Sequence, residues 1–322
     1  MRIIHLDHLT HLSAPCAATI GFFDGLHRGH QFLLQQVVEK AKEEGLSSMA
    51  ITFDLHPRMV LNAEYIPQML CTLEEKLELL EKSGIDFVTV IHFTPQLASM
   101  PARQFMNDIL LTQLGVRCLV IGYDNRFGKD RSEAFPDYVS YGNSMNMEVI
   151  EAKALIIDGM NVSSSLIRKS LRSGKIDLAN RCLGYIYGIK GTVVSGHHEG
   201  RRMGFPTANL DNGDSDLIVP APGVYATLVH IEGHNQTWHG MTNIGMRPTF
   251  GGHHMSIETH IIGFSEDIYG RKMEIRFVGH VREERKFASA AELVLQLQAD
   301  TMTVEEMIKK GKYEEQDTED YH

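Results

Sequence analysis

The apolar pattern changes character about halfway along the chain, and this change most restricts the folds that the chain can adopt. From residue 17 to about residue 150, short apolar runs rich in β-forming residues alternate with helical patterns; the runs lie at 17–22, 48–53, 86–93, 116–122 and 147–151. Strands that alternate with helices form a parallel sheet covered by helices, whose ligands bind at the carboxyl ends of the strands. The first half therefore predicts an α/β domain.

Proline and glycine mark the helix ends in this half. The first helical pattern ends near Gly45, the second runs from Leu73 to Ser83 with Gly84 after it, and the third starts at Pro101 and stops before Gly115. Proline fits the first turn of a helix, and glycine readily takes the left-handed conformation just past its end. These prolines and glycines lie where the apolar pattern predicts that helices begin and end.

The second half has a different pattern. After a helical stretch at roughly 163–182, glycines recur every few residues from 185 to 281, and short alternating runs replace the helices, at 223–231, 237–245, 256–262 and 272–278. This pattern is typical of a small antiparallel β-barrel. A helical pattern at about 289–310 closes the chain.

We therefore predict two domains, 1–184 and 185–322. The length of 322 residues supports this division, because single cores usually stop growing near ~100–200 residues.

Composition narrows the classes of function. A formal net charge of −10 argues against a general nucleic-acid binder and against a polybasic membrane-surface protein.

The four cysteines lie far apart, so we expect buried free thiols. The N-terminus is charged where a signal peptide needs an apolar core, and no apolar run approaches the ~20 residues that span a bilayer. We expect a cytoplasmic protein; the sequence leaves its oligomeric state open.

The segment Gly21–His30, Gly-Phe-Phe-Asp-Gly-Leu-His-Arg-Gly-His, lies at a predicted strand-to-helix turn. Glycines there let the backbone approach a ligand, and the first amides of a helix are unpaired donors suited to phosphate. His27 and His30 are three residues apart and share one face of the helix entrance. The candidate ligand-binding residues of this turn are Gly21, Phe23, Asp24, Gly25, His27, Gly29 and His30.

Other segments at predicted strand or helix ends could line the same crevice. Asp124 and Asn125 follow a predicted strand and could reach a base or ribose, or form an ordinary β-turn. Ser163 could be an ordinary helix N-cap, but hydroxyl groups one turn before Arg168 also suit a triphosphate. The hydroxyl candidates are Ser163, Ser164 and Ser165. The segment 52–57, Thr-Phe-Asp-Leu-His-Pro, follows another predicted strand.

A glycine-rich stretch of the second half can wrap phosphates through backbone N–H groups. Its candidate residues are Gly191, Gly196, Gly204 and Pro206. Thr207 and Asn209 point the same way if the backbone is extended, and they offer hard oxygen ligands suited to Mg²⁺.

Two charged positions in this half allow more than one interpretation. Glu258 alternates with apolar residues, so it either faces solvent on a barrel strand or acts as a base. Arg282, taken alone, would belong to a solvated charged turn. Two histidine pairs, His197–His198 and His253–His254, lack a third spaced ligand, and we interpret them as surface loop residues.

Taken together, these motifs resemble those of the bacterial bifunctional riboflavin kinase/FAD synthetases. The resemblance covers nearly the whole chain and rests on segments in both halves, at 21–30, 52–57, 121–128, 161–168 and 204–209. It implies a Rossmann-like nucleotidyltransferase domain followed by a riboflavin kinase barrel with a C-terminal helix. It also implies two reactions, from riboflavin and ATP to FMN, and from FMN and ATP to FAD with release of pyrophosphate.

The resemblance assigns roles to the candidate residues. In the first domain ATP phosphates would be held by His27, His30, Ser163, Ser164 and Arg168, with Asp124 in the adenylyl site. In the second domain Thr207 and Asn209 would hold Mg²⁺ and ATP, Glu258 would take the proton of the ribityl hydroxyl, and Arg282 would lie on the flavin side.

Two residues depart from the family pattern. Ser165 stands where threonine is usual and keeps the hydroxyl, whereas Leu55 replaces the first proline of a Phe-x-Pro-x-Pro pattern. Two alternatives are a kinase without adenylylation and a flavin-binding carrier without turnover. The intact His-x-Gly-His argues against the first alternative, and Glu258, Thr207 and Asn209 argue against the second.

Overall fold

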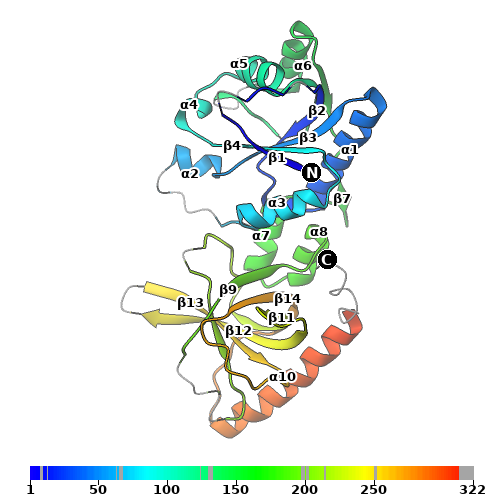
Figure 1. Cartoon of the computed structure of the whole chain (residues 1–322). Coiled ribbons are helices and arrows are strands. Elements are labelled where there is room, and N and C mark those ends of the chain that lie inside the picture. The colour runs from blue at the N-terminus through cyan, green and yellow to red at the C-terminus, as the bar shows by residue number, and fades with distance from the viewer. Residues whose placement is uncertain are drawn as a thin grey trace. The chain divides into compact units, whose positions relative to one another are not determined.

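The computed structural model describes residues 1–7, 10–12, 14–62, 64, 68–123, 125–129, 133–196, 200, 203–213, 215–249 and 252–311, with the backbone alone at 247–249 and 252–254. The chain forms two compact units, Met1–Ser164 and Ser165–His322. Figure 1 shows the helices and strands of both units.

The first unit is built on a six-stranded sheet in which all strands are parallel. The spatial order is β1-β4-β3-β2-β5-β6. The strands are β1 (Arg2–His5), β2 (Cys16–Ile20), β3 (Ser47–Phe53), β4 (Phe87–Ile91), β5 (Val116–Ile121) and β6 (Glu148–Glu151). Strands β2 to β6 coincide with the predicted runs, which confirms the α/β class; β1 was not predicted.

Successive strand residues point to opposite faces of this sheet, and helices cover both faces. Ala17 packs in a cluster with residues of α1, whereas Ala18 packs with Phe105 and Leu110 in a second cluster. The helices are α1 (Arg28–Glu44), α2 (Pro57–Leu61), α3 (Leu73–Glu81), α4 (Pro95–Ala98), α5 (Ala102–Gln104), η2 (Phe105–Gln113) and α6 (Phe135–Ser144).

The predicted helix after Pro101 is two elements, a short α5 and the π-helix η2. The glycine predictions held: Gly45 ends α1 with φ 66°. Helices α2, α4 and α6 were not predicted; α2 and α4 have only five and four residues.

A short hairpin precedes the helices near the middle of the chain. It consists of β7 (Ile156–Ile157) and β8 (Met160–Asn161). Asp158 and Gly159 at its tip have φ of 51° and 74°, the two left-handed residues that a tight hairpin turn favours.

The predicted helical stretch at 163–182 is two helices, α7 (Ser164–Arg172) and α8 (Ile176–Leu183). Within the second unit, Leu171 O accepts a hydrogen bond from Ala221 N at 3.0 Å, and Asn180 Nδ2 donates to Phe277 O at 2.8 Å. The compact units therefore divide at the start of α7, and the boundary at 184 stays a prediction about functional domains.

The second unit contains a closed antiparallel barrel of order β10-β13-β12-β11-β14-β9. The strands are β9 (Gly188–Val194), β10 (Ala208–Asp211), β11 (Gly223–Ile231), β12 (Thr237–Thr249), β13 (Gly252–Ile261) and β14 (Lys272–Arg282). Helix α10 (Ala290–Gly311) lies along the barrel in Figure 1. These elements confirm the predicted barrel and its terminal helix.

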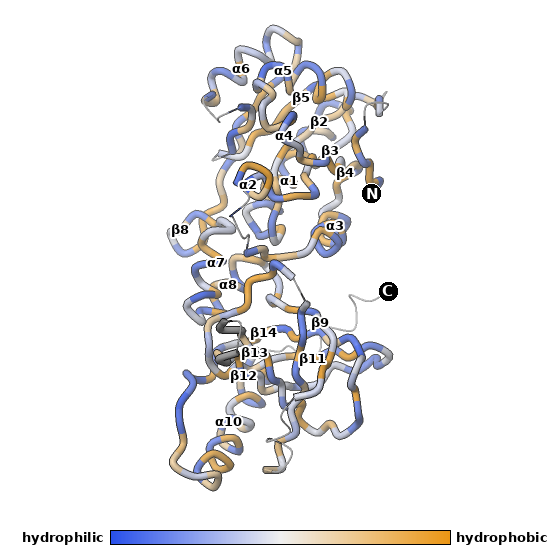
Figure 2. The backbone as a smooth tube through the Cα atoms, turned by 90° about the vertical axis from the view of Figure 1, so that its left-hand side faces the viewer, coloured by the Kyte–Doolittle hydropathy of each residue, from blue (hydrophilic) through white to orange (hydrophobic). Residues whose placement is uncertain are grey.

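The terminal helix α10 carries both hydrophobic and hydrophilic residues, as Figure 2 shows. Its buried Val304 and Ile308 pack on Val224 and Leu228 of β11. Burying this apolar stripe fixes the helix against the barrel.

The structure also bears on the remaining sequence predictions. All four cysteines are buried thiols. None of the helices in the described part of the chain combines the length and the apolar character needed to cross a membrane. His253 and His254 belong to β13 rather than to a loop, whereas His197 and His198 lie outside the described residues.

Candidate active sites

The first candidate site is the turn between β2 and α1, which includes the 3-10 helix η1 (Asp24–Leu26). After β2 the chain adds β3 and β4 on one side, then β5 and β6 on the other. Ligands of such sheets bind at the carboxyl ends of the strands where the order reverses. The turn therefore lies at the expected ligand crevice of this fold.

The backbone of this turn is unusual. Phe23, Gly25 and Leu26 have φ of 55°, 72° and 31°. A left-handed conformation is readily available to glycine but costs other residues energy, of the order of 1–3 kcal/mol each. Contacts from elsewhere in the unit must hold the two non-glycine residues in place.

The two predicted histidines lie together at the start of α1. Their rings stack with centroids 3.6 Å apart and 16° between planes. His27 is 4% exposed, and its Nδ1 accepts a hydrogen bond from His30 N at 3.3 Å. In the neutral ring an accepting Nδ1 leaves the proton on Nε2, so His27 can donate from Nε2.

Gly29 allows the start of α1 to approach the serine segment of the first unit. A Cβ at Gly29 would lie 3.1 Å from Val162 O and 3.1 Å from His27 Nδ1. Ser164 Oγ donates to Asp24 O at 3.2 Å. The structure thus brings the predicted Ser163–Ser164 segment to the turn that carries His27.

Asp24 and Asn125 make internal contacts in this region. The Asp24 carboxylate is 3% exposed and accepts from Leu70 N at 2.9 Å. Asn125 Nδ2 donates to Ile20 O, which ties the segment after β5 to the end of β2. Their roles toward a ligand stay predictions, and Asp124 lies outside the described residues.

The remaining predicted residues of the first motif set have these positions. Gly21 faces the Phe23 ring, which a Cβ would approach to 3.0 Å. Ser165 is exposed and Arg168 half-buried, both on α7 in the second unit. Arg168 lies one helical turn after Ser164.

Sequence reasoning missed a pair of side chains at the ends of β3 and β4. His92 Nδ1 lies 2.6 Å from Asp54 Oδ2. Desolvation acts to raise the pKa of Asp54, but hydrogen bonds from His92 and from the N–H groups of Phe93 and Leu55 leave it below its ordinary value. Asp54 was visible after a predicted strand, whereas His92, on the next strand's end, carried no motif.

The second candidate site is a row of polar side chains on the barrel. Glu258 of β13 lies directly opposite Asn209 of β10 and, on its other side, opposite Asn243 of β12. Ile257 and Thr259 are buried at 3% and 0% exposure, so Glu258 between them points to the outside of the barrel. The strand register brings together the predicted base and a predicted metal ligand.

Glycines shape the surroundings of this row. A Cβ at Gly196 would overlap the Asn209 side-chain amide, so only glycine leaves room for it. Gly191 likewise lies against the Asp211 backbone, and Gly204 has φ of 83°. Gly191 belongs to strand β9 rather than to a loop, and phosphate binding by the backbone at Gly191 and Gly196 stays a prediction, while 197–199 and 201–202 are outside the described residues.

A cavity of about 290 Å³ in the second unit is lined by the predicted Pro206 and Thr207, whereas Asn209, Glu258 and Asn243 are not among its lining residues. Pro206 O accepts a hydrogen bond from His260 Nδ1 at 2.8 Å. The other lining residues are Val193, Ala208, Thr259, Ile261, Phe264, Ser265, Glu266, Asp267, Ile268 and Tyr269. A cavity lined by both apolar and polar groups can bury the apolar ring of a ligand such as a nucleotide.

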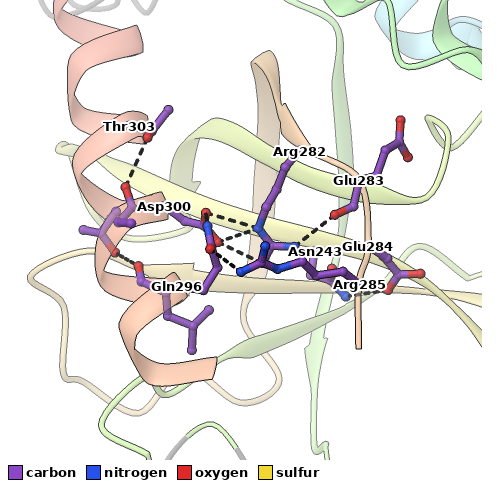
Figure 3. Close-up of polar contacts among 11 residues, drawn as sticks. Asn243, Arg282, Glu283, Glu284, Arg285, Gln296, Asp300 and Thr303 are labelled. Carbon is purple, nitrogen blue, oxygen red and sulfur yellow. Dashed lines mark hydrogen bonds and ion pairs between the residues drawn. The ribbon is translucent and has the colours of Figure 1, made fainter. Parts of the chain in front are cut away.

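Arg282 is not part of a solvated turn. Its Nε and Nη2 donate to Asp300 Oδ2 of α10 at 2.9 and 2.8 Å, and Asp300 is 2% exposed (Figure 3). Gln296 Nε2 donates to the same carboxylate at 2.6 Å. Nearby, Asn243 Nδ2 donates to Glu284 Oε1 at 3.3 Å. The segment after β14 therefore connects α10 with the row that includes Glu258, and flavin contact by Arg282 stays a prediction.

Family models match both halves of the chain. The FAD synthetase model matches residues 9–166, and the riboflavin kinase model matches residues 183–308.

Curated relatives match most of the length. The Escherichia coli K12 protein named bifunctional riboflavin kinase/FMN adenylyltransferase is 34% identical, covering 90% of this chain and 92% of the relative. The Bacillus subtilis protein of the same name is 35% identical, covering 93% and 96%.

A solved structure also matches most of the chain. It is a Streptococcus pneumoniae protein described as a macrolide-efflux protein, 29% identical with TM-score 0.84, covering 94% of this chain and 98% of that one. The efflux description concerns that protein; the two family models decide the family here.

The parallel sheet with paired histidines at its switch point, followed by a barrel with a glycine-lined polar row, defines a transferase of two nucleotide-using domains. Each half matches its own family model, and relatives that carry both activities in their name align over about nine-tenths of the chain. The chain belongs to the bifunctional riboflavin kinase/FMN adenylyltransferases.

Proposed function

We propose that the barrel transfers the γ-phosphoryl group of ATP to riboflavin and that the parallel-sheet domain joins the resulting FMN to AMP. In the first reaction the ribityl hydroxyl oxygen bonds to the γ-phosphorus, its proton leaves, and ADP departs. In the second an FMN phosphate oxygen bonds to the α-phosphorus and pyrophosphate departs. What supports the proposal is that each half matches its own family model and that the first motif follows β2, where the order of the parallel strands reverses.

In the kinase half, Glu258 is the proposed proton acceptor. It stands between Asn209 and Asn243 in the strand register, so flanking amides can orient the carboxylate toward a hydroxyl. The cavity lined by Pro206 and Thr207 is the proposed place of the nucleotide.

Mg²⁺ fits the donors of this half. Thr207 offers a hydroxyl oxygen and Asn209 an amide oxygen, and Gly196 leaves the space that the Asn209 amide occupies. Hard oxygen donors of this kind hold Mg²⁺ together with substrate phosphates. When bound, the ion supplies charge neutralisation for the transferring phosphoryl group.

In the adenylylating half no protein base is required, because the FMN phosphate is already ionised. The proposed contribution is electrostatic: N–H groups of His27 and His30 and the first amides of α1 would stabilise charge on the ATP phosphates. Ser164 reaches the same turn, and a role for Ser163 is proposed from the family motif. The role of Arg168 toward pyrophosphate is proposed from the family motif.

The proposed substrates are small molecules, which a net charge of −10 favours over nucleic acid. Four buried thiols suit a reducing compartment, and we propose a cytoplasmic location.

The experiment incubates the protein with riboflavin, ATP and Mg²⁺ and resolves FMN and FAD over time. FMN should appear first and FAD after it. A parallel reaction starting from FMN tests the second step alone: ATP consumption without FAD would leave a kinase only. Flavin binding without ATP consumption in either reaction would indicate a carrier.

A further inference from the structure

Helix α3 carries a lysine whose ammonium group is buried beneath the phosphate-binding turn. Lys76 is 2% exposed. Its Nζ donates to Phe22 O at 3.1 Å, Thr52 Oγ1 at 3.1 Å and Phe53 O at 2.9 Å. An ammonium group has three N–H donors, and here each finds one oxygen.

The three acceptors come from two neighbouring segments. Phe53 ends β3, and Thr52 precedes it. Phe22 lies between β2 and the left-handed Phe23 of the turn, and Thr52 Oγ1 also donates to Phe22 O at 3.1 Å. Lys76 therefore fastens the first residues of the turn to the end of the adjacent strand.

Residues just before Lys76 hold the middle of the same turn. Leu70 N donates to Asp24 Oδ1 at 2.9 Å, and Gly25 N donates to Cys71 Sγ at 3.1 Å. The segment 70–76 thus contacts three of the four residues from 22 to 25. These contacts can maintain the costly backbone conformation on which the position of His27 depends.

The surroundings favour a charged lysine despite its burial. Nζ lies 4.2 Å from the centroid of the Phe22 ring, a cation–π contact. Burial lowers the pKa of Lys76 to about 8, while Cys71, Asp24 and Asp54 act to raise it. Loss of a proton removes one of the three donors, so the link between turn and strand weakens as the amine becomes neutral.

We propose that Lys76 is a positioning residue for adenylyl transfer: through Phe22 O, Thr52 Oγ1 and Phe53 O it holds the Gly21–Leu26 turn so that His27 and His30 meet the ATP phosphates. Lys76 itself touches no substrate. This inference rests on the proposed adenylylation of FMN in this domain.

The first test is Lys76→Met, which keeps the length of the side chain and removes its donors. The kcat of FAD formation from FMN and ATP should fall about 10²-fold, the effect that a ~1 Å misplacement of reacting groups can have. The KM for ATP should change by less than about 3-fold, because the phosphate donors remain present. Riboflavin phosphorylation in the same preparation should stay unchanged.

The matched control is Lys40→Met. Lys40 is another lysine of the first unit, and its ammonium pairs with Glu44 at 2.5 Å and Glu148 at 3.0 Å instead of with the turn. Its loss should lower the unfolding temperature without lowering the kcat of FAD formation. Equal losses of kcat in the two variants would reduce Lys76 to a general stabilising residue and overturn the proposal.

A pH profile separates positioning from simple packing. In the wild type the kcat of FAD formation should fall as pH rises through about 8, where Lys76 loses its proton. Among the facing groups, burial raises the pKa of Cys71 to about 12, and Asp54 has a lowered pKa; the others are the carboxylates Asp24 and Glu75. Lys76→Met should lack this decline, and Lys76→Arg, which stays charged, should lack it while retaining more activity.

The outcomes are distinct. A folded Lys76→Met with FAD formation within about 2-fold of wild type overturns the proposal. If that variant does not fold, the wild-type profile decides, and an alkaline decline that is absent, or that persists in Lys76→Arg, overturns it. Absence of FAD formation in the wild type would instead refute the proposed function itself.

Discussion

The two candidate sites are held in place in different ways. In the barrel, Asn209, Glu258 and Asn243 occupy matching positions on adjacent strands, so backbone hydrogen bonds of the ladder fix their spacing. In the first unit, His27 follows a turn with two left-handed non-glycine residues, Phe23 and Leu26. That turn is held by hydrogen bonds with Lys76 of α3 and with Leu70 and Cys71, which precede α3.

This difference suggests how each site responds to substitution. A ladder of many backbone hydrogen bonds tolerates the loss of one side chain, so effects in the barrel should be confined to the residue changed. A turn held by a few buried side chains transmits changes at its supports to the catalytic groups, as proposed for Lys76. Substitutions in each site can test that contrast.

Replacing the proposed base gives the largest effect. Glu258→Gln should lower riboflavin phosphorylation by ~10²–10⁴-fold, the usual contribution of a positioned acid or base, because the amide cannot take up the hydroxyl proton. FAD formation from supplied FMN should continue at the wild-type rate. Steady-state FMN production measures the change; loss of both activities in a folded protein would show that the two sites are not independent.

His30→Ala is the corresponding change in the first unit. It removes a proposed donor to the transferring phosphate, and FAD formation should fall by ~10²–10³-fold, as with loss of one transition-state donor. Riboflavin phosphorylation serves as the internal control. Since the His30 ring also stacks on His27, a double His27→Ala, His30→Ala variant no worse than the single one would mean that the pair acts as a unit.

The core strands could be predicted because they are covered on both faces and read as continuous apolar runs. Strand β1 escaped because it is short and lies at the sheet edge, with Ile3 42% exposed. The break between α7 and α8 was readable in principle from Gly174, which has φ of 66°. A π-helix such as η2 has no such local signal.

The same distinction between local and long-range signals applies to the residues of the two sites. His27, His30, Thr207 and Asn209 were accessible because their chemistry depends on spacings of two or three residues. Lys76 was not, because the carbonyl oxygen of Phe22 that it contacts lies 54 positions away. Asp300 was hidden for the same reason, since its meaning appears only when α10 docks on Arg282. Supports of a site come from long-range packing, which a local pattern does not encode.

Gly29→Ala tests whether the turn transmits small displacements. The new methyl group would lie 3.1 Å from Val162 O and from His27 Nδ1, so His27 or the serine segment must shift by a few tenths of an ångström. FAD formation should fall by about 10-fold, less than for an outright misplacement of ~1 Å.

Gly45→Ala is the control at the other end of the same helix, since no atom lies within 4 Å of its added Cβ. Its left-handed φ costs stability, but the substitution should spare the kcat. A Gly29→Ala protein as active as wild type would contradict the claim that this turn is the sensitive part of the molecule.

Asp300→Asn carries the smallest expected effect on catalysis and tests the barrel side of the contrast. The carboxylate is buried and accepts from both Arg282 and Gln296, and charge-assisted hydrogen bonds contribute ~1.5–3 kcal/mol. The second unit should therefore lose about 2 kcal/mol of unfolding free energy, measured by denaturant titration. Because Glu258 is fixed by the strand register rather than by α10, riboflavin phosphorylation below the unfolding transition should fall by no more than a few fold.

A Lys310→Gln variant, whose ion pair with Glu306 is 3.9 Å long and exposed, controls for loss of one charge on the helix. A collapse of kcat in folded Asp300→Asn would mean that the terminal helix supports the barrel site as α3 is proposed to support the turn, and the contrast between the two sites would be lost.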